Sequence, residues 1–527
     1  DGGWIARWSS PGYADLMVGT SADVAFADAW LKGVRHFDVR AFYQSALKDA
    51  TVVSPLAGTG RKGLQRSIFN GYTDTAVDEG LSWSMDGYIN DFAIGNLAAA
   101  LAAAPAADDP YAAHYADDAA YFHQRALGYV NLFDPAVGFF VGRDAKGNWR
   151  EDAKHFDPLR WGGDYTETNA WNMAFHAPQD GAGLAALYGG RAGLAAKLDA
   201  FFATPGAFHV GSYGEPIHEM LEARDVRMGQ YGHSNQPSHH IIYMYDVAGQ
   251  PWKTQDKVRD VLSRLYIGSE IGQGYPGDED NGEMSAWYLF SAAGFYPLRM
   301  GTPAYVIGAP YFPHMDIALD NGRHIVIDAP AVSDTNRYVQ GLRVNGQPWN
   351  KLTLPHALLA QGATLEFLMG PTPSRWASDE AALPPSLTPH GRPQPLRDPG
   401  AATSSTPTIA GLPALFDNDS ASEAVLPATS TTIAWHYAAP RRVALLTLTS
   451  AARAAAPSGW QLQASVDGHH WRTLDTRQQQ RFAWPRQTRA FAVPAPGEYA
   501  HYRLHFDAAP DASPRALAEI ELLGPTP

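Results

Sequence analysis

The sequence predicts an α+β multidomain protein in which a helical domain is followed by a small β module and a β-sandwich. Apolar residues recur at helical spacing up to about residue 300, and Gly and Pro mark the loops between these stretches. Beyond Pro297 the pattern changes to short alternating runs separated by Asn-Gly turns. With 527 residues the chain is too long for a single core, so several domains are expected.

The helical domain is expected over residues 1–300. Its helices are predicted at 25–34, 41–50, 88–103, 112–132, 181–202, 238–248, 253–266 and 284–293. Serial helices joined by loops that hold the polar clusters favour a helical toroid, although a bundle or a solenoid has the same signature. No fixed-period repeat is visible in the sequence, which disfavours the solenoid.

Three further segments complete the predicted domain order. Residues 301–370 form a β module packed on the helical domain, with strands at 305–307, 324–328, 338–344 and 364–369. The stretch 371–413 is dense in Pro, which is typical of a semi-extended linker without a core. Residues 414–527 form a β-sandwich, with strands at 431–437, 442–449, 460–466, 489–491, 502–506 and 517–523.

The composition excludes several classes of function. A net charge of −14 argues against a nucleic-acid partner, which needs a basic face, and against an anionic membrane surface. Cysteine is absent from the sequence, which excludes disulfides and zinc thiolates. Aromatic residues reach 12%, a high share that fits either large aromatic cores or surfaces that stack on carbohydrate.

The sequence contains no membrane span and no targeting signal that we can identify. No apolar run approaches the length needed to cross a bilayer. The chain begins DGGW, without a start Met or a signal pattern, so we expect a processed or trimmed product of a longer precursor.

Two acidic segments carry the clearest chemical signal, and the first reads GDYTETNAW. Within it, Glu167 stands shortly before Trp171. An apolar neighbour raises the pKa of a carboxyl group, as a general acid near neutral pH requires, and a flat ring can hold a sugar. The alternative interpretation makes Glu167 an ordinary helix-start carboxylate, with Thr166, Thr168 or Asn169 as the capping residue.

The second acidic segment reads GDEDNGEMSAW. In an extended loop alternate residues share a face, so Asp278 and Asp280 can point at one water molecule, with Glu279 turned away. Gly277 and Gly282 let the backbone turn sharply around the acids. The alternative interpretation is a solvated acidic turn without a catalytic role.

A polar stretch between residues 213 and 240 lies between these segments in the sequence. It combines carboxylates, side-chain amides and imidazoles, and such oxygen ligands suit Ca²⁺. The spacing of a His-Glu-x-x-His zinc site does not occur in it.

Several blocks of residues 1–370 resemble glycoside hydrolase family 92, a family of α-mannosidases. In chain order these blocks are GVRHFD, NQPSHH, AGQPWKTQ, GEMSAWY and GFYP. The resemblance implies an (α/α)6 toroid and a Ca²⁺-dependent, exo-acting hydrolysis of α-mannosides with inversion. It implies that Glu167 is the general acid and that Asp278 and Asp280 form the base pair, with Asp280 as the base proper.

The resemblance also implies binding residues. It places His218 and Glu219 at the aglycone subsite that α-1,2-specific members use, and Trp171 stays the expected sugar platform. Its calcium-ligand candidates are Glu219, Asn235, Gln236 and Asp278. Some members have Glu where this chain has Gln236, so one ligand charge is missing and calcium binding is expected to be weaker.

Both ends of the chain carry further expectations from resemblance. Family members begin with an N-terminal β-sandwich that helps to close the active site, whereas this chain starts inside the helical domain. That sandwich is therefore expected either to be missing or to lie on a separate chain of the same precursor. Residues 414–527 resemble the discoidin, or factor 5/8 C-type, fold through FDND, WQLQAS and AEIEL, which implies a carbohydrate-binding or structural role.

The expected reaction is a single displacement on terminal α-1,2-linked mannose of mannose-containing glycans, as in N-glycan processing. Glu167 protonates the departing oxygen, and Asp280, helped by Asp278, activates a water across roughly 6.5–9.5 Å. A mannosyl-phosphate diester hydrolase, which can dispense with the acid, is one alternative. A non-catalytic glycan-binding protein and a calcium-independent toroid glycosidase are the others. Such glycans lie outside the cell, so a secreted or periplasmic bacterial enzyme is expected.

Overall fold

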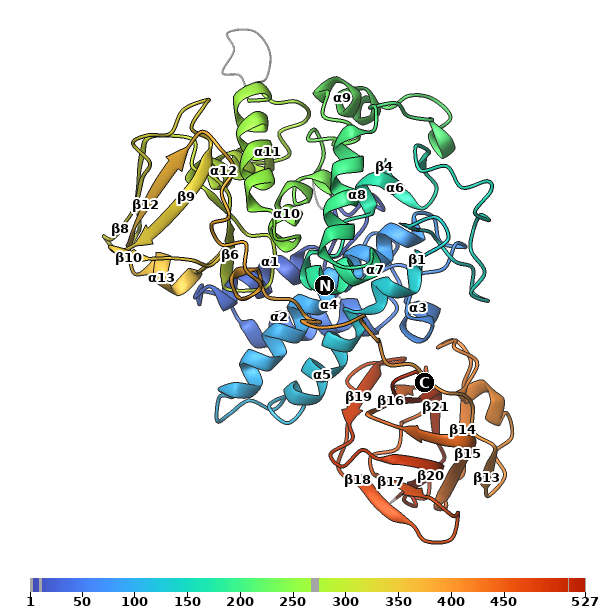
Figure 1. The fold of residues 1–527 in the computed structure, drawn as a ribbon. Coiled ribbons are helices and arrows are strands. Elements are labelled where there is room, and N and C mark those ends of the chain that lie inside the picture. Colours follow the sequence, from blue (N-terminus) through green and yellow to red (C-terminus); the bar gives the residue numbers. More distant parts are fainter. Residues whose placement is uncertain (1–2, 9–11, 267–273, 510, 527) are drawn as a thin grey trace.

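The computed structural model describes residues 3–8, 12–266, 274–509 and 511–526. Helices gather in the centre of the molecule, a β module lies on one side, and a β-sandwich extends from the other end (Figure 1). The α+β multidomain class is therefore confirmed, while the closure of the helices into an (α/α)6 toroid stays a prediction. Within the described residues, no helix is both long and apolar enough to cross a membrane.

The helices of the first domain are more numerous than the sequence predicts, and some are longer than predicted while others are split or shortened. They are α1 (Ala22–Leu31), α2 (Val39–Thr51), α3 (Leu64–Asn70), α4 (Gly80–Ala103), α5 (Tyr115–Arg125), α6 (Ala170–Met173), α7 (Gly181–Leu187), α8 (Arg191–Ala203), α9 (His218–Val226), α10 (Met244–Val247), α11 (Pro251–Arg264) and α12 (Glu283–Ala293). The helix expected over 181–202 is interrupted because Gly189 and Gly190 have φ values of 83° and 105°. The helix expected over 238–248 is mostly 3₁₀ turn, and only α10 is α-helical.

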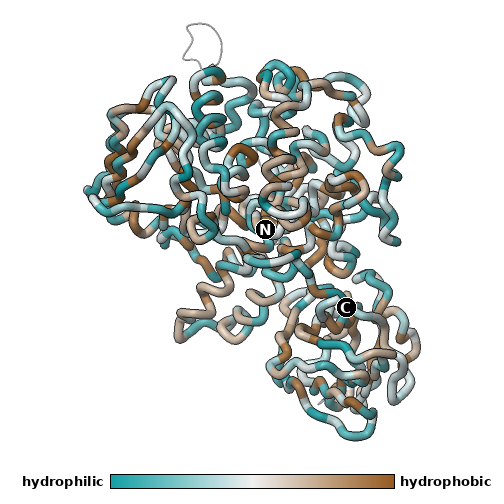
Figure 2. The backbone as a smooth tube through the Cα atoms, viewed as in Figure 1, coloured by the Kyte–Doolittle hydropathy of each residue, from teal (hydrophilic) through white to brown (hydrophobic). Residues whose placement is uncertain are grey.

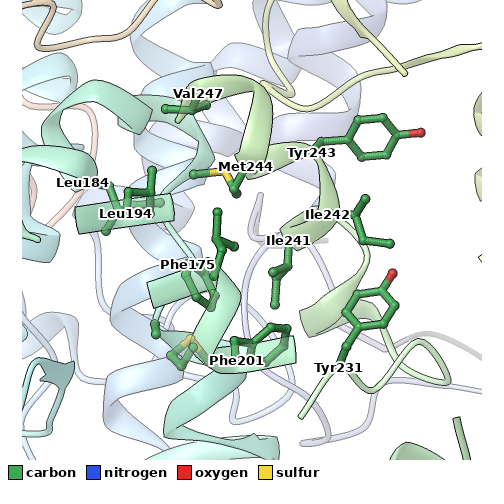
Figure 3. Packing of buried hydrophobic residues seen from close by; sticks show 14 of the residues in the cluster. Phe175, Leu184, Leu194, Phe201, Tyr231, Ile241, Ile242, Tyr243, Met244 and Val247 are labelled. Carbon is green, nitrogen blue, oxygen red and sulfur yellow. The ribbon is translucent and has the colours of Figure 1, made fainter. Parts of the chain in front are cut away.

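The core of the helical domain joins segments that are far apart in the sequence (Figure 3). Phe175, Leu184, Phe201, Ile241 and Met244 are fully buried and point toward one another between α7, α8 and α10. Burial of each such side chain contributes roughly 1.5–3 kcal/mol relative to exposure. In Figure 2, hydrophobic stretches of the backbone accordingly concentrate in the interior of the domain, and hydrophilic stretches lie along its outer loops. The polar clusters lie on loops that connect the helices of this core.

The β module contains every strand expected within 301–370 and several more. Its larger sheet has the order β10 (Gln347–Pro348), β9 (Tyr338–Val344), β12 (Ala363–Gly370), β8 (His324–Asp328) and β7 (His314–Ala318). A second sheet holds β11 (Thr353–Pro355), β6 (Ala304–Ile307) and β5 (Phe295–Tyr296). The pair β8 and β12 is parallel, and a short helix, α13 (His356–Ala360), precedes β12. Buried aliphatic residues of both sheets form one core.

The Pro-rich segment 371–413 is more tightly packed than a linker without a core. Trp376 is buried in the core of the β module, and its indole nitrogen donates to the Trp349 carbonyl (3.0 Å). Ser386 donates its hydroxyl proton to Asp180 (2.6 Å), whose carboxylate also accepts from the backbone N–H of Thr388. Pro therefore stiffens a strap that is tied to the helical domain, and the expected absence of a core is wrong.

The C-terminal segment forms two facing sheets, in agreement with the predicted sandwich. One has the order β13 (Ser404–Thr406), β15 (Thr431–Arg442), β20 (Glu498–Phe506), β17 (Trp460–Ser465) and β18 (Arg472–Arg477). The other has β14 (Ala424–Leu426), β21 (Arg515–Leu523), β16 (Leu445–Ser450) and β19 (Thr488–Ala492). Trp435, Trp460 and Tyr502 are fully buried between the sheets. The resemblance to the discoidin fold stays a prediction.

The sandwich contacts the helical domain through an apolar cluster, in which Leu445, Ala490 and Leu523 pack with buried residues of the helices, and through charged and polar groups. Arg477 pairs with Asp117 of α5 (2.8 Å), and that carboxylate also accepts from the backbone N–H of Ala492 (3.0 Å). On the other side of the contact, Gln65 donates to Asp419 (2.7 Å). The two domains therefore share hydrogen bonds that neither can satisfy alone.

We expect Arg477→Met to lower the free energy of unfolding by roughly 2 kcal/mol, because it leaves the nearly buried Asp117, and Asp475 within the sandwich, without their charged partner. The estimate lies below that for a fully buried pair, since the Arg477 side chain keeps 19% exposure. The midpoint of thermal unfolding measures the effect. Arg472→Met, on the exposed end of the same strand, is the matched control. Equal shifts for both variants would contradict the assignment.

Candidate active site

A short hairpin presents the predicted acid. Its strands are β3 (Trp161–Gly162) and β4 (Tyr165–Asn169), and Glu167 lies on the second strand with φ of 48°. The Asn169 side chain accepts hydrogen bonds from Trp171 N (3.1 Å) and Asn172 N (3.3 Å) and so caps α6. Asn169 therefore performs the capping that the alternative interpretation required, and Glu167 precedes the helix without taking part in it.

The surroundings of Glu167 favour its protonated form. Burial raises the pKa of this carboxyl group above its ordinary value, and the charges of Glu219 and Asp280 raise it further. A hydrogen bond from Asn235 Nδ2 to Glu167 Oε2 (2.9 Å) opposes them by stabilising the ionised form. A carboxyl group with a raised pKa can hold a proton near neutral pH and give it up when a basic oxygen develops.

Of the three carboxylates in the acidic turn before α12, one makes hydrogen bonds within the turn and two are exposed. Glu279 accepts hydrogen bonds from Gly282 N (2.7 Å), Ser285 N (3.1 Å) and Ser285 Oγ (2.7 Å), so it caps α12. Asp278 and Asp280 are left exposed. The turn passes through left-handed backbone at Asp280 (φ 53°), as Glu167 does. Such conformations cost roughly 1–2 kcal/mol for a residue with a Cβ and gather at functional sites.

Two adjacent amide side chains bring the separated acidic segments together. Asn235 Nδ2 donates to Glu167, and Gln236 Nε2 donates to Asp280 Oδ2. The backbones of the two loops also approach closely at Gly277, because a Cβ added there would lie 2.6 Å from the Ser234 carbonyl oxygen. The predicted acid and the predicted base thus meet over neighbouring residues of one loop.

The His218-Glu219 pair lies at the start of α9 beside this group. His218 Nε2 is 3.0 Å from Glu219 Oε1, and His218 Nδ1 is 3.1 Å from Glu222 Oε1. Burial lowers the pKa of His218, but the hydrogen bond that His218 donates to Glu222 and the charges of the neighbouring carboxylates, including Glu219 and Asp278, outweigh it and raise the pKa. The structure therefore places an exposed imidazole among carboxylates, next to the predicted acid.

The candidate calcium ligands form a set of mixed oxygen donors. In the described part of the chain, no group of three or more His, Asp or Glu side chains is arranged to hold a metal ion. Glu219 nevertheless has a buried oxygen, Oε2, that lacks a hydrogen-bond partner. Its charge acts on Glu167, to which Asn235 donates, and on His218, on which the charge of Asp278 also acts. Unpaired carboxylate oxygen beside amide oxygens is the chemistry that Ca²⁺ accepts.

Trp171 does not stand in this cluster as a sugar platform. Its ring packs edge-on against Phe139 (4.9 Å between centroids) and contacts Phe201, and the Lys197 ammonium group lies 4.6 Å from its centroid. Trp287, at the end of the second acidic segment, is fully buried. Trp287 belongs to the core, and Trp171 is partly buried and packs against it, because the helices that follow the acidic loops turn these positions toward the core.

Several residues of the site were not predicted from the sequence. Glu79, before α4, is a further partly buried carboxyl group whose pKa burial raises above its ordinary value, and the charge of Glu167 contributes to this rise. Ser82 and Ser212 hold the hairpin, and Tyr213 accepts from Glu167 N (2.8 Å). The positions of these residues in the sequence do not indicate a role in the site, because they approach Glu167 only in the tertiary fold.

A cavity of about 350 Å³ lies elsewhere, where α4 and α5 face β21. Arg61, Asp91, Arg125 and Glu521 contribute to its wall. Arg61 and Arg125 both pair with Asp91, at 2.6 and 2.9 Å, and Arg61 also lies 3.7 Å from Asp23, so two carboxylates compensate the two guanidinium groups within the fold. The carboxylates described above, which lie outside this hollow, stay the predicted catalytic residues.

Comparisons with known proteins identify glycosidases that are similar to this chain. An inverting family 92 mannosidase from Bacteroides thetaiotaomicron has a similar structure, with 35% identity, coverage of 73% of this chain and 50% of that one, and a TM-score of 0.64. A family 92 α-mannosidase of the same organism, solved with mannoimidazole, is similar at 30% identity, with coverage of 70% and 46% and a TM-score of 0.62. An uncharacterized secreted glycosidase from Arthroderma benhamiae is 24% identical over 70% of this chain and 47% of its own length.

The chain spans about half the length of these relatives. The family model described as the glycosyl hydrolase family 92 catalytic domain matches residues 1–371. That match covers the helical domain, the β module and all the carboxylates of the candidate site. The chain therefore belongs to glycosyl hydrolase family 92.

Proposed function

We propose that the protein is an exo-acting, inverting α-mannosidase that removes terminal α-1,2-linked mannose from glycans outside the cell. One observation carries the proposal: Asn235 and Gln236 hold two carboxylates from distant segments, of which one is partly buried and the other exposed. Hydrolysis of a glycoside with inversion needs one carboxyl group that gives a proton and one that takes a proton. The α-mannosidase activity of relatives supports the substrate class.

The proposed reaction is a single displacement. Glu167 gives its proton to the glycosidic oxygen as the bond between that oxygen and the anomeric carbon breaks. Asp280, assisted by Asp278, takes a proton from a water molecule whose oxygen forms the new bond from the opposite face. The products are β-mannose and the shortened glycan, and a proton then returns from Asp280 to Glu167 through solvent.

The raised pKa of Glu167 predicts the alkaline side of the pH–rate profile. The general acid works only while protonated, so kcat/KM falls as pH rises through the pKa of Glu167, and a raised pKa extends activity toward neutral pH. We expect Glu219→Gln to move this limb to lower pH, because it removes a negative charge that raises the pKa of Glu167. A limb that stays in place, whatever the fall in rate, would contradict the electrostatic coupling.

A calcium ion fits the residues proposed to hold it. Glu219, Asn235, Gln236 and Asp278 offer carboxylate and amide oxygens, and the unpartnered Glu219 Oε2 is suited to a cation. When bound, the ion would supply positive charge toward two hydroxyl groups of the terminal sugar. His218 and Glu219 would contact the next sugar, which is the basis for proposing the α-1,2 linkage.

Incubation with α-1,2-linked mannobiose, with and without a chelator, tests the proposal. We expect calcium-dependent release of mannose that NMR detects first as the β-anomer. The chelator is also expected to lower the midpoint of thermal unfolding, because a ligand that binds only the folded state stabilises it. Release of α-mannose would contradict inversion, and binding without release would instead indicate a glycan-binding protein.

A further inference from the structure

The hairpin that carries Glu167 is held from two opposite sides by side-chain hydroxyl groups. On one side the Thr166 N–H donates to Ser82 Oγ of α4 (3.0 Å). On the other side the next N–H, that of Glu167 itself, donates to the Tyr213 hydroxyl oxygen (2.8 Å). Consecutive peptide groups are thus fixed from outside the hairpin, and the plane of the Glu167 peptide cannot rotate without loss of a bond.

The second side is a 3₁₀ turn, Gly211–Tyr213, that fits closely against the hairpin. A Cβ added to Gly162 would lie 2.1 Å from Ser212 Oγ and 2.9 Å from the Tyr213 ring. One added to Gly211 would lie 1.9 Å from the Trp161 carbonyl oxygen. Ser212 Oγ also accepts from Gly163 N (2.7 Å). The turn and the hairpin therefore keep a single relative position.

The contact between the 3₁₀ turn and the hairpin stabilises an unfavourable backbone conformation at Glu167. A residue with φ of 48° within a strand returns to ordinary extended backbone unless its surroundings hold it. Such a return would rotate the side chain and break the contact between Glu167 Oε2 and Asn235 Nδ2. Burial raises the pKa of Tyr213 to about 12, so its hydroxyl group stays neutral over the range in which the enzyme would be assayed.

We infer that Tyr213 is a positioning residue for Glu167, which it keeps aimed at the glycosidic oxygen through the hydrogen bond to the Glu167 backbone. This inference rests on the proposed role of Glu167 as the general acid. Tyr213 acts only through that carboxyl group, so its contribution depends on how much acid assistance the leaving group needs.

Tyr213→Phe tests the inference, because it removes the hydroxyl group and keeps the ring. For α-1,2-mannobiose we expect kcat to fall roughly tenfold while KM changes less than about twofold. For dinitrophenyl α-mannoside, whose leaving group departs without a proton, kcat should stay within about twofold of the wild type. The alkaline limb of the pH profile should stay in place, because the ring still excludes water from Glu167.

Tyr188→Phe is the matched control. It removes a tyrosine hydroxyl group that donates to the Ala174 carbonyl (2.8 Å) in the same domain, and neither substrate should respond to it. Equal losses of Tyr213→Phe on both substrates, or no loss on mannobiose, would overturn the inference. Tyr213→Ala is a second variant, and we expect it to lower kcat for mannobiose and also to move the alkaline limb to lower pH, since water then reaches Glu167.

The two proposals fail in different ways. If Glu167→Gln loses the same factor on both substrates, Glu167 is not the acid and the proposed function fails first. If Glu167→Gln discriminates between the substrates and Tyr213→Phe does not, only the positioning role of Tyr213 is wrong. Thermal unfolding of each variant shows whether the fold has survived the change.

Discussion

Glu167→Gln is expected to lower kcat for α-1,2-mannobiose by about 10²–10⁴-fold, the range in which a positioned general acid contributes. The amide keeps the size of the side chain but has no proton to give to the departing oxygen. On dinitrophenyl α-mannoside the loss should be less than about tenfold, since that leaving group is stable as an anion. Steady-state kinetics on the two substrates measure the difference.

Two controls accompany this variant. Glu366→Gln, an exposed position on β12, should leave both rates unchanged. The alkaline limb of the pH profile should disappear in Glu167→Gln, because the group whose pKa burial has raised no longer titrates. If the limb persists, another acid supplies the proton, and the partly buried Glu79 becomes the first candidate.

Asp280→Asn should lower kcat by about 10²–10⁴-fold on every mannoside, good leaving group or not. Water must lose a proton to attack, whichever group departs, so the loss should not depend on the aglycone. The variant also changes the partner of Gln236, from a carboxylate to an amide. Rates on mannobiose and on dinitrophenyl α-mannoside test this independence.

Azide separates a lost base from a damaged site. It attacks as an anion without giving up a proton, so it should partly restore the reaction of Asp280→Asn with dinitrophenyl α-mannoside, with β-mannosyl azide as product. Glu279→Gln is the matched control in the same turn, where the side chain caps α12 and should matter for stability more than for rate. Rescue of Asp278→Asn but not of Asp280→Asn would exchange the roles of the two aspartates.

The parts of the fold that depend on local pattern could be predicted from the sequence. The strands 324–328 and 338–344 have the predicted bounds because alternation and Asn-Gly turns specify them locally. Helix α9 was not predicted because Gly214 and Pro216 stand just before it, as in a loop, and its N-cap, Ile217, has no capping side chain. The predicted helix 181–202 overlooked the break at Gly189 and Gly190, whose conformations end α7.

Only those candidate site residues could be predicted whose chemistry can be recognised from adjacent residues in the sequence, without knowledge of the tertiary contacts. Carboxylates beside Gly and Asn single out Glu167, Asp278 and Asp280 at the level of the sequence, and the structure brings these segments together. The packing of the Trp171 ring against Phe139 could not be predicted, because adjacency in sequence does not state which face of a helix a ring occupies. The hydroxyl group of Tyr213 reaches Glu167 across the fold, and no spacing rule reveals that contact.

The left-handed backbone at Glu167 and Asp280 limits how stable a working version of this protein can become. Replacement of either residue by Gly would relieve the conformational strain, by about 1 kcal/mol each, and would remove a carboxyl group that the proposed reaction needs. A screen that rewards heat resistance alone would therefore favour inactive chains at these two positions. Thermostable variants that keep their activity should carry their gains elsewhere, in loops, caps and domain contacts.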